Sequence, residues 1–227
     1  MVIIELLSVL NVRSPRNALS LGSLRLRLAE DLSFWLKFAK SNPSISFAYI
    51  VGHLEVNPST IFSDASSSFG MGGCITFKKP VAGFHGKFWQ ISWIDFSRIV
   101  SLRRLRPRHV GINVAEFIAA LITQETFLAD CENFLSIHFV DNTSALAWLN
   151  KDRCSVSPFD KLAQAMALKK LACCAKIWHR YIPTKENTVA DEASRKQYGQ
   201  LMIVNGARFK KSRPRWNETL RFIKVRK

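Results

Sequence analysis

The sequence has few cysteines and no long apolar run. Its five cysteines in 227 residues include no Cys-x-x-Cys pair, which excludes a disulfide scaffold and paired zinc ligands. No apolar run approaches the roughly 18 residues that span a bilayer. The apolar segment 1–10 has no basic region before it and contains Glu5, so we do not expect a signal peptide. We therefore expect an intracellular protein, cytoplasmic or nuclear, with reduced thiols, no disulfide partner and no membrane partner.

Acidic residues are also scarce. The chain has 17 Asp and Glu against 33 Lys and Arg, a net charge of +16. Such an excess favours a polyanionic partner, nucleic acid before an acidic membrane surface. The alternative is a basic surface without a specialised partner. With 48% hydrophobic and 11% aromatic residues, the chain can form a folded core.

The pattern of apolar residues divides the chain into three segments. Residues 1–55 are predicted to be helical, with apolar positions at helical spacing from Leu24 to Ala39. Residues 56–195 alternate in the order β-β-β-α-β-α-α-β-α, which predicts a mixed α/β domain. Residues 196–227 form a basic tail with ten Lys or Arg and one acid, Glu218.

Four acidic residues stand at the ends of predicted elements in the middle segment. Asp64 ends the first strand, Asp141 follows the strand 135–140, and Glu116 and Asp191 lie in the first turns of helices. The carboxyl ends of neighbouring parallel strands converge on one edge of a sheet. Carboxylates that meet there repel one another unless a cation neutralises them, and Mg²⁺ prefers oxygen ligands.

Each acid also has a structural interpretation. Asn113 and Glu116 have the spacing of a capping box, Asp191 can stabilise a helix N-terminus, and Asp141 can begin a helix. Any one of these acids alone is more typical of a structural role. The four together favour a site.

Four sequence segments carry a family resemblance. Phe62–Ser66 with Gly70–Gly73, Ile112–Ala119, Phe139–Ala145 and Tyr181–Arg195 resemble, in this order, the acidic motifs of the ribonuclease H domain of retroelement reverse transcriptases. Gypsy-like and DIRS-like retrotransposons are the most similar. The last segment is the most specific, because its Pro, Asn, Ala-Asp and Ser-Arg follow the family order. The resemblance covers about residues 24–195, and no Tyr-x-Asp-Asp polymerase signature is present.

The resemblance implies a ribonuclease H-like fold, with a five-stranded mixed sheet flanked by helices and a helical N-terminal connection segment. It implies an endonuclease that cleaves the RNA strand of an RNA–DNA hybrid with two Mg²⁺ ions, for which Mn²⁺ can substitute. Asp64, Glu116, Asp141 and Asp191 would be the catalytic and metal-binding residues. A reverse transcriptase polymerase domain would be a partner.

The resemblance also places Ser66 and Asn142 near the substrate strand. Many cellular ribonucleases H have a histidine before the last acidic motif, and this chain has none there. His179 is close in sequence, but we expect it to be a packed strand histidine.

Two basic regions are candidates for contact with nucleic acid. The first is a predicted loop from Arg98 to His109, whose further arginines are Arg103, Arg104, Arg106 and Arg108. The second is the tail, where aromatic residues, among them Phe209 and Trp216, alternate with basic ones in a mix that suits base stacking. A passive tail that aids solubility is the alternative. The other tryptophans of the strands and helices, Trp178 included, are expected in the core.

Two further functions compete with the nuclease. One is a catalytically inactive nucleic-acid-binding module of the same fold. The other is a transposase or integrase domain, but the acid order Asp, Glu, Asp, Asp differs from the Asp, Asp, Glu order of that family.

Overall fold

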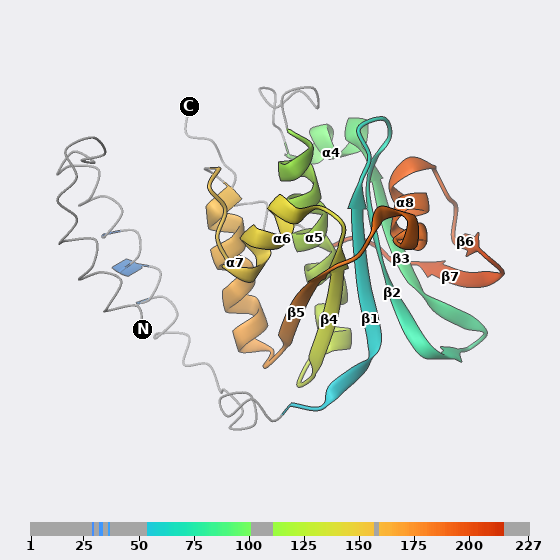
Figure 1. Cartoon of the computed structure of the whole chain (residues 1–227), viewed down its shortest axis with the longest axis horizontal. Helices are drawn as coiled ribbons and strands as arrows, with labels where there is room; N and C mark the ends of the chain where they lie inside the picture. Colours follow the sequence, from blue (N-terminus) through green and yellow to red (C-terminus); the bar gives the residue numbers. More distant parts are fainter. Residues whose placement is uncertain are drawn as a thin grey trace. The chain divides into compact units, whose positions relative to one another are not determined.

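A computed structural model describes residues 54–100, 111–156 and 159–215, together with Ala29, Leu32, Ser33 and Leu36 (Figure 1). The chain divides into two compact units, Met1–Pro43 and Ser44–Lys227. The fold described below belongs to the second unit. Most of the predicted connection segment, the arginines from Arg103 to Arg108 and the end of the tail lie outside the described residues.

One mixed sheet organises the second unit. In the order in which they lie side by side, its seven strands are β5 (Lys176–Tyr181), β4 (Leu135–Val140), β1 (Val56–Ala65), β2 (Gly70–Val81), β3 (Phe84–Ser92), β7 (Ala207–Lys211) and β6 (Leu201–Val204). β4 runs parallel to β1 and to β5, whereas β2 is antiparallel to both of its neighbours. The carboxyl ends of β1, β4 and β5 therefore lie at one edge.

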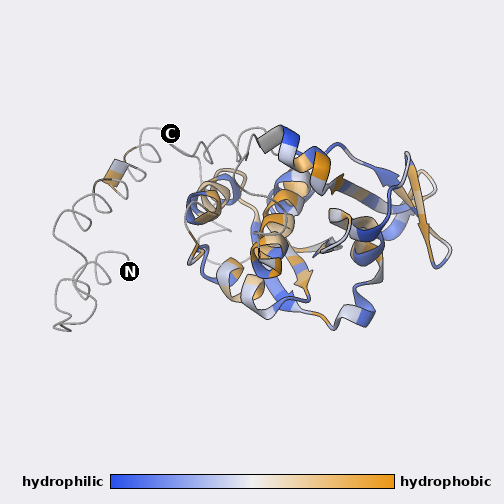
Figure 2. Cartoon of the chain, turned by 90° about the horizontal axis from the view of Figure 1, so that it is seen from above, coloured by the Kyte–Doolittle hydropathy of each residue, from blue (hydrophilic) through white to orange (hydrophobic). Residues whose placement is uncertain are grey.

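Helices cover both faces of the sheet (Figure 1). Their bounds are α4 (Trp93–Val100), α5 (Ile112–Phe127), α6 (Thr143–Asn150), α7 (Phe159–Ala172) and α8 (Thr188–Arg195). The larger core cluster joins α5, α6 and α7 to one face, with Trp89 and Phe117 fully buried. The smaller cluster joins Ala193 of α8 and the β6–β7 hairpin to the opposite face. Most of these elements carry a mixture of hydrophobic and hydrophilic residues (Figure 2).

The central helix α5 is buried nearly all round. With the 3-10 turn Leu128–Cys131 it is long and apolar enough to cross a membrane by length and composition, but 83% of that window is buried inside the domain. The core helix of a folded domain has the same composition. All five cysteines are among the described residues, and no disulfide joins any of them.

The prediction of an α/β fold with a mixed sheet flanked by helices is confirmed, but five strands was the wrong number. Residues 201–211, assigned to the tail, form a hairpin whose strand β7 pairs with β3. Asn205 and Gly206 both have positive φ, as a tight hairpin turn requires. Met202 and Phe209 are buried at 0% and 2% exposure. Phe209 is therefore a core residue and is not free to stack on bases.

Two element boundaries also differ from the predictions. Trp93 begins α4, although the sequence pattern predicts one strand over 88–94. Arg98, assigned to the arginine loop, lies in α4 and pairs with Asp95 at 3.2 Å. The aromatic and β-branched residues around Trp93 favour a strand locally, and Ser92 overrides them by accepting from the Asp95 N–H as a helix N-cap does.

Candidate metal centre

Three of the four predicted acids come together. Asp64, Glu116 and Asp141 each offer a carboxylate oxygen within 4.8 Å of the others, a group that could hold a metal ion. The parallel register pairs Phe62 of β1 with Phe139 of β4, so Asp64 and Asp141 lie two residues further at the same edge. Glu116 reaches them from the first turns of α5. Asp64 and Glu116 are buried, and Asp141 is half-buried.

Glu116 is held by the strand and not by its own helix. Its Oε2 accepts from the Ala65 backbone N–H at 3.1 Å. The N-cap of α5 is Gly111, without a side-chain cap, and Asn113 Oδ1 accepts from Asn142 Nδ2 at 2.9 Å. The capping-box interpretation is therefore wrong, because the Glu116 side chain turns toward β1.

Asp64 is held by α8, which packs on the opposite face from α5. The Ser194 hydroxyl donates to Asp64 Oδ2. α8 lies close to the sheet at Gly72, where an added Cβ would come 2.6 Å from the Ala193 carbonyl carbon. The absence of a side chain at Gly72 thus permits the approach that brings Ser194 to Asp64.

The pKa values of the three carboxyls are all raised. Burial raises the pKa of Asp64 to about 6, with the Asp141 and Asp191 charges adding and Ser194 opposing. Burial, followed by the charges of Asp64 and Asp141, raises the pKa of Glu116 to about 9. Burial also raises the pKa of Asp141, against a hydrogen bond from Thr184. Such a cluster retains protons unless a cation neutralises it.

Asp191 lies beside this group without belonging to it. It is in the first turn of α8, and its Oδ1 accepts from Arg195 Nε at 2.6 Å. Its charge still raises the pKa of Asp64, Glu116 and Asp141. The structure thus places Asp191 within electrostatic reach of the cluster, paired to a cation of its own helix.

The two residues expected near a substrate strand have internal partners. The Ser66 hydroxyl is 2.8 Å from the Ser68 hydroxyl, and Ser66 is 6% exposed. Asn142 caps α6 by accepting from the Ala145 N–H at 2.9 Å. Because Asn142 is the N-cap, Asp141 is not needed to begin that helix. Arg103, Arg104, Arg106 and Arg108 lie outside the described residues.

Sequence reasoning missed a buried polar chain behind the carboxylates. Ser63 Oγ lies 2.9 Å from His138 Nε2, and Gln124 Nε2 lies 3.2 Å from His138 Nδ1 and 3.0 Å from His179 Nε2. Burial lowers the pKa of His138 to about 3, so it is neutral. His179 is a packed strand histidine, as expected. The strand register pairs His138 with His179, and the packing of α5 on the sheet adds Gln124.

Asn187 also has a role that its position in the sequence did not reveal. It precedes α8 but provides no side-chain cap. Its Nδ2 instead donates to the Ser63 carbonyl at 3.0 Å, and it hydrogen-bonds to Asp141. Its buried Oδ1 has no hydrogen-bond partner among the described residues. Asn187 therefore ties the loop before α8 to the strand that carries Asp64.

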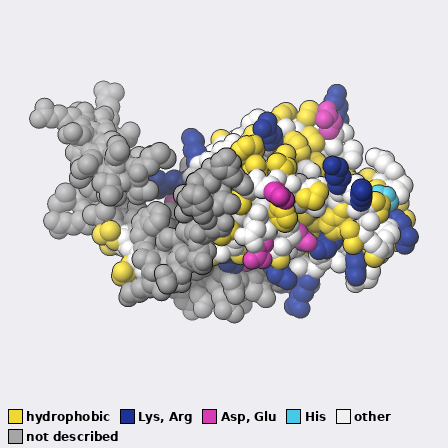
Figure 3. All heavy atoms as spheres, turned by 90° about the horizontal axis from the view of Figure 1, so that it is seen from below, with side chains coloured by type: hydrophobic (Ala, Val, Ile, Leu, Met, Phe, Trp, Pro, Cys, Tyr) yellow, Lys and Arg dark blue, Asp and Glu magenta, His cyan; other side chains and the backbone are white. Residues whose placement is uncertain are grey.

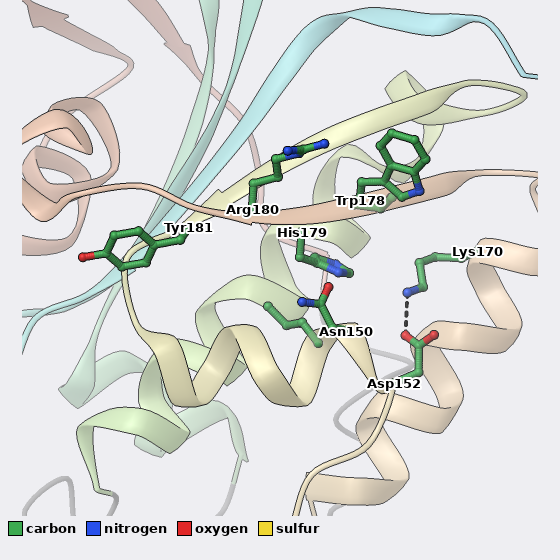
Figure 4. Close-up of a pocket in the computed structure, with 9 residues that line it drawn as sticks. Asn150, Asp152, Lys170, Trp178, His179, Arg180 and Tyr181 are labelled. Atoms are coloured by element: carbon green, nitrogen blue, oxygen red, sulfur yellow. Dashed lines mark hydrogen bonds and ion pairs between the residues drawn. The ribbon is translucent and has the colours of Figure 1, made fainter.

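A polar pocket of about 500 Å³ lies along β5. It contains the ion pair of Lys170 and Asp152, at 2.6 Å, and His179 (Figure 4). None of the four acids lines it. The pocket is therefore separate from the carboxylate cluster.

No protein-family model matches this chain, and no curated protein is significantly similar to it. The chemistry of the carboxylate cluster and the motifs that supply its residues are therefore the features that indicate a function.

Proposed function

We propose that the protein is a metal-dependent endonuclease that hydrolyses the RNA strand of RNA–DNA hybrids, as part or relic of a retrotransposon reverse transcriptase. The observation that carries this proposal is the carboxylate cluster of Asp64, Glu116 and Asp141 at the carboxyl ends of adjacent parallel strands. These acids fall in three of the four motifs that resemble retroelement ribonuclease H. The contiguous strands β5-β4-β1-β2-β3 fit the expected five-stranded sheet, with the hairpin added at one edge.

The residues fit a hard divalent cation. All the ligand atoms are carboxylate oxygens, which suit Mg²⁺. Burial, with the repulsion between the carboxylates added to it, raises the pKa values of Asp64 and Glu116, and a bound cation would oppose both effects. Asp64, Glu116 and Asp141 would bind one metal ion. Asp191, together with Asp64, would bind a second. Bound ions of this kind activate a water and stabilise the leaving oxygen in phosphodiester hydrolysis.

The chain itself orients these ligands. Ala65 N–H fixes Glu116, Ser194 fixes Asp64, and Asn187 and Thr184 contact Asp141. Each of the three carboxylates thus has a hydrogen-bond partner on a different element. These partners limit how far the carboxylates can move apart when their charges repel.

The charge of the molecule supports a nucleic-acid substrate. The net charge is +16, although the candidate site itself is acidic. Lys and Arg side chains are scattered among hydrophobic ones, with a few Asp and Glu between them, on the face seen in Figure 3. Basic groups attract phosphates, while discrimination of RNA from DNA requires contacts to 2′-hydroxyls.

One observation favours the catalytically inactive alternative. Arg195 holds Asp191 in an ion pair at 2.6 Å, which competes with a metal for that carboxylate. An inactive module would bind hybrids through the same surface without cleaving them.

Cleavage of a labelled RNA–DNA hybrid, compared with duplex DNA and duplex RNA, tests the proposal. We expect Mg²⁺-dependent cleavage of the hybrid only, reduced at least about 100-fold in Asp64→Asn and Glu116→Gln. Asp95→Asn is the matched control, since Asp95 is an exposed acid that does not belong to the cluster. Hybrid binding without cleavage by the wild type would establish the inactive alternative. Equal cleavage by Asp64→Asn and wild type would contradict the mechanism.

A further inference from the structure

One side of the sheet at β4 and β5 presents residues that no described helix covers, and Phe62 of β1 lies at its border, packed against the core cluster that includes Ala193 of α8. α8 packs on β1, β2 and β3, whereas the helices that pack on β4 and β5 are α6 and α7, on the other side. The register places Phe62, Phe139 and Arg180 across the three strands on this side, with Ile137 and Trp178 in the next row. We call these five residues the aromatic face.

The aromatic face is accessible. Trp178 is 46% exposed, although the sequence predicted it in the core, and Phe62 and Phe139 are partly exposed. The rings of Phe62 and Phe139 stack with centroids 5.4 Å apart. The Arg180 guanidinium lies 6.0 Å from the centroid of the Trp178 ring. Figure 4 shows both of these side chains on one side of β5 and His179 on the other.

The aromatic face is continuous with the carboxylate cluster. Side chains alternate along a strand, so Asp64 and Asp141, two residues beyond Phe62 and Phe139, project on the same side as those rings. The strands are about 4.8 Å apart, so the face spans about 10 Å from β1 to β5, the width of two or three stacked bases.

We propose that the aromatic face binds single-stranded nucleic acid, with bases stacked on Trp178, Phe139 and Phe62 and a phosphate held by Arg180. Exposed aromatic rings on an open sheet, with basic side chains among them, are the arrangement that stacks bases without sequence preference. Lys176 adds a second cation on the same side, and in the described strands β1, β4 and β5 no acid lies on that side before Asp64 and Asp141.

The charge argues against a second copy of this chain as the occupant. Two molecules of net charge +16 repel each other, whereas a polyanion is attracted. The proposed site is distinct from the cleavage chemistry, since stacking and the Arg180 contact need no metal ion. It would hold a single strand that continues past the carboxylates.

Fluorescence anisotropy of the full chain with labelled oligothymidylate and oligoadenylate, in EDTA, tests this site. We expect the double variant Trp178→Ala/Arg180→Ala to raise Kd at least about tenfold, since loss of a stacking ring typically weakens binding by about 5- to 150-fold per base. Trp178→Phe, which keeps a ring, is expected to stay within about threefold of wild type.

The matched control is Phe84→Ala/Arg208→Ala. It removes another arginine that lies over an aromatic ring, at 5.6 Å, and the same net charge. We expect a change in Kd below about twofold for this control. Thermal melts of both double variants verify folding, which the exposure of Trp178 favours.

Three results would overturn the proposal. The first is an unchanged Kd in Trp178→Ala/Arg180→Ala, and the second is an equal change in Kd in the control Phe84→Ala/Arg208→Ala. The third is a dimer, seen by light scattering, that Trp178→Ala/Arg180→Ala dissociates while Kd is unchanged. The two proposals fail separately. If Asp64→Asn loses hybrid cleavage but still binds single strands, both proposals are supported. If the wild type binds single strands but cleaves no hybrid, only the nuclease proposal is overturned.

Discussion

The buried carboxyls of Asp64 and Glu116 make the stability of the metal-free protein depend on pH. Their native pKa values, about 6 and about 9, lie above the ordinary 3.8 and 4.5, so the native state keeps protons that the unfolded chain releases. The stability that these protons provide is complete below about pH 4 and is lost as the pH rises through the two native values.

We therefore expect the metal-free wild type to melt at a lower temperature at about pH 8 than at about pH 5. Asp64→Asn should be more stable than wild type at about pH 8, by on the order of 1 to 3 kcal/mol, with little difference at about pH 4. Thermal melts in EDTA across this range measure it, with Asp95→Asn as control. A wild-type stability that is flat in pH would show that the cluster is not buried in solution.

The pair of Asp191 and Arg195 predicts a weak second metal site. The Arg195 guanidinium, with its Nε 2.6 Å from Asp191 Oδ1, already neutralises the carboxylate that would bind a second ion with Asp64. We expect calorimetric titration with Mn²⁺ to show a tight and a weak event in wild type. Arg195→Ala should tighten the weak event by up to about fivefold, and Asp191→Asn should remove it. A single event in all three proteins would mean that only the cluster of Asp64, Glu116 and Asp141 binds metal.

At the level of residues, the sequence predicted correctly that three acids meet, because their positions follow from the strands and the helix that carry them. Asp64 and Asp141 come together because parallel strands end at one edge, and Glu116 joins them from the helix that crosses that edge. The Arg195 pair and the Asn187 contact to Ser63 depend on side-chain rotamers and on a loop path. No spacing in the sequence encodes these, so they could not be predicted.

At the level of elements, the packing of α8 against β2 determines where Ser194 lies. Gly72→Ala would place a Cβ 2.6 Å from the Ala193 backbone, so the helix must move away from the sheet. We expect a loss of about 1 to 3 kcal/mol in the free energy of unfolding and a weaker Mn²⁺ affinity, because Ser194 moves from Asp64. Denaturant unfolding and calorimetry measure the two effects.

Gly199→Ala is the matched control for this substitution, since its Cβ meets nothing within 4 Å and is expected to leave both quantities unchanged. Unaltered metal affinity in a destabilised Gly72→Ala protein would show that Asp64 does not depend on α8 for its position.

The hairpin β6–β7 shows where element prediction failed and why. The Asn205-Gly206 turn and the alternating apolar residues on either side of it are a hairpin signal in the sequence itself. The high density of Lys and Arg led to its assignment as a tail. The prediction of a buried Trp178 failed for a different reason. A strand at the edge of a sheet and a strand covered by helices on both faces have the same local sequence pattern, so the pattern does not show which face a helix covers.

At the level of the whole molecule, an acidic centre lies in a strongly basic chain. The described part holds several of its cations in ion pairs, including Lys170 with Asp152 and Lys87 with Asp130. The arginines from Arg103 to Arg108 have no acid among them in the sequence. These are the residues for which phosphate contact remains the strongest expectation.

We therefore expect the affinity for an RNA–DNA hybrid to fall steeply with salt, and the four arginines to account for much of the slope. Each phosphate contact contributes about 0.9 to the slope of log affinity against log salt for B-form DNA, so replacing Arg103, Arg104, Arg106 and Arg108 by Gln should lower it by about 2 to 4. Anisotropy at several salt concentrations, in EDTA, measures the slope.

The control replaces four exposed cations elsewhere, Lys78, Lys79, Lys151 and Arg153, by Gln, which removes the same charge. Equal slopes in the two variants would mean that net charge alone, and not contact by the arginines, holds the hybrid. A lower slope confined to the arginine variant, with the preference for hybrid over duplex DNA retained, would show that these residues position the duplex while the sheet domain selects it.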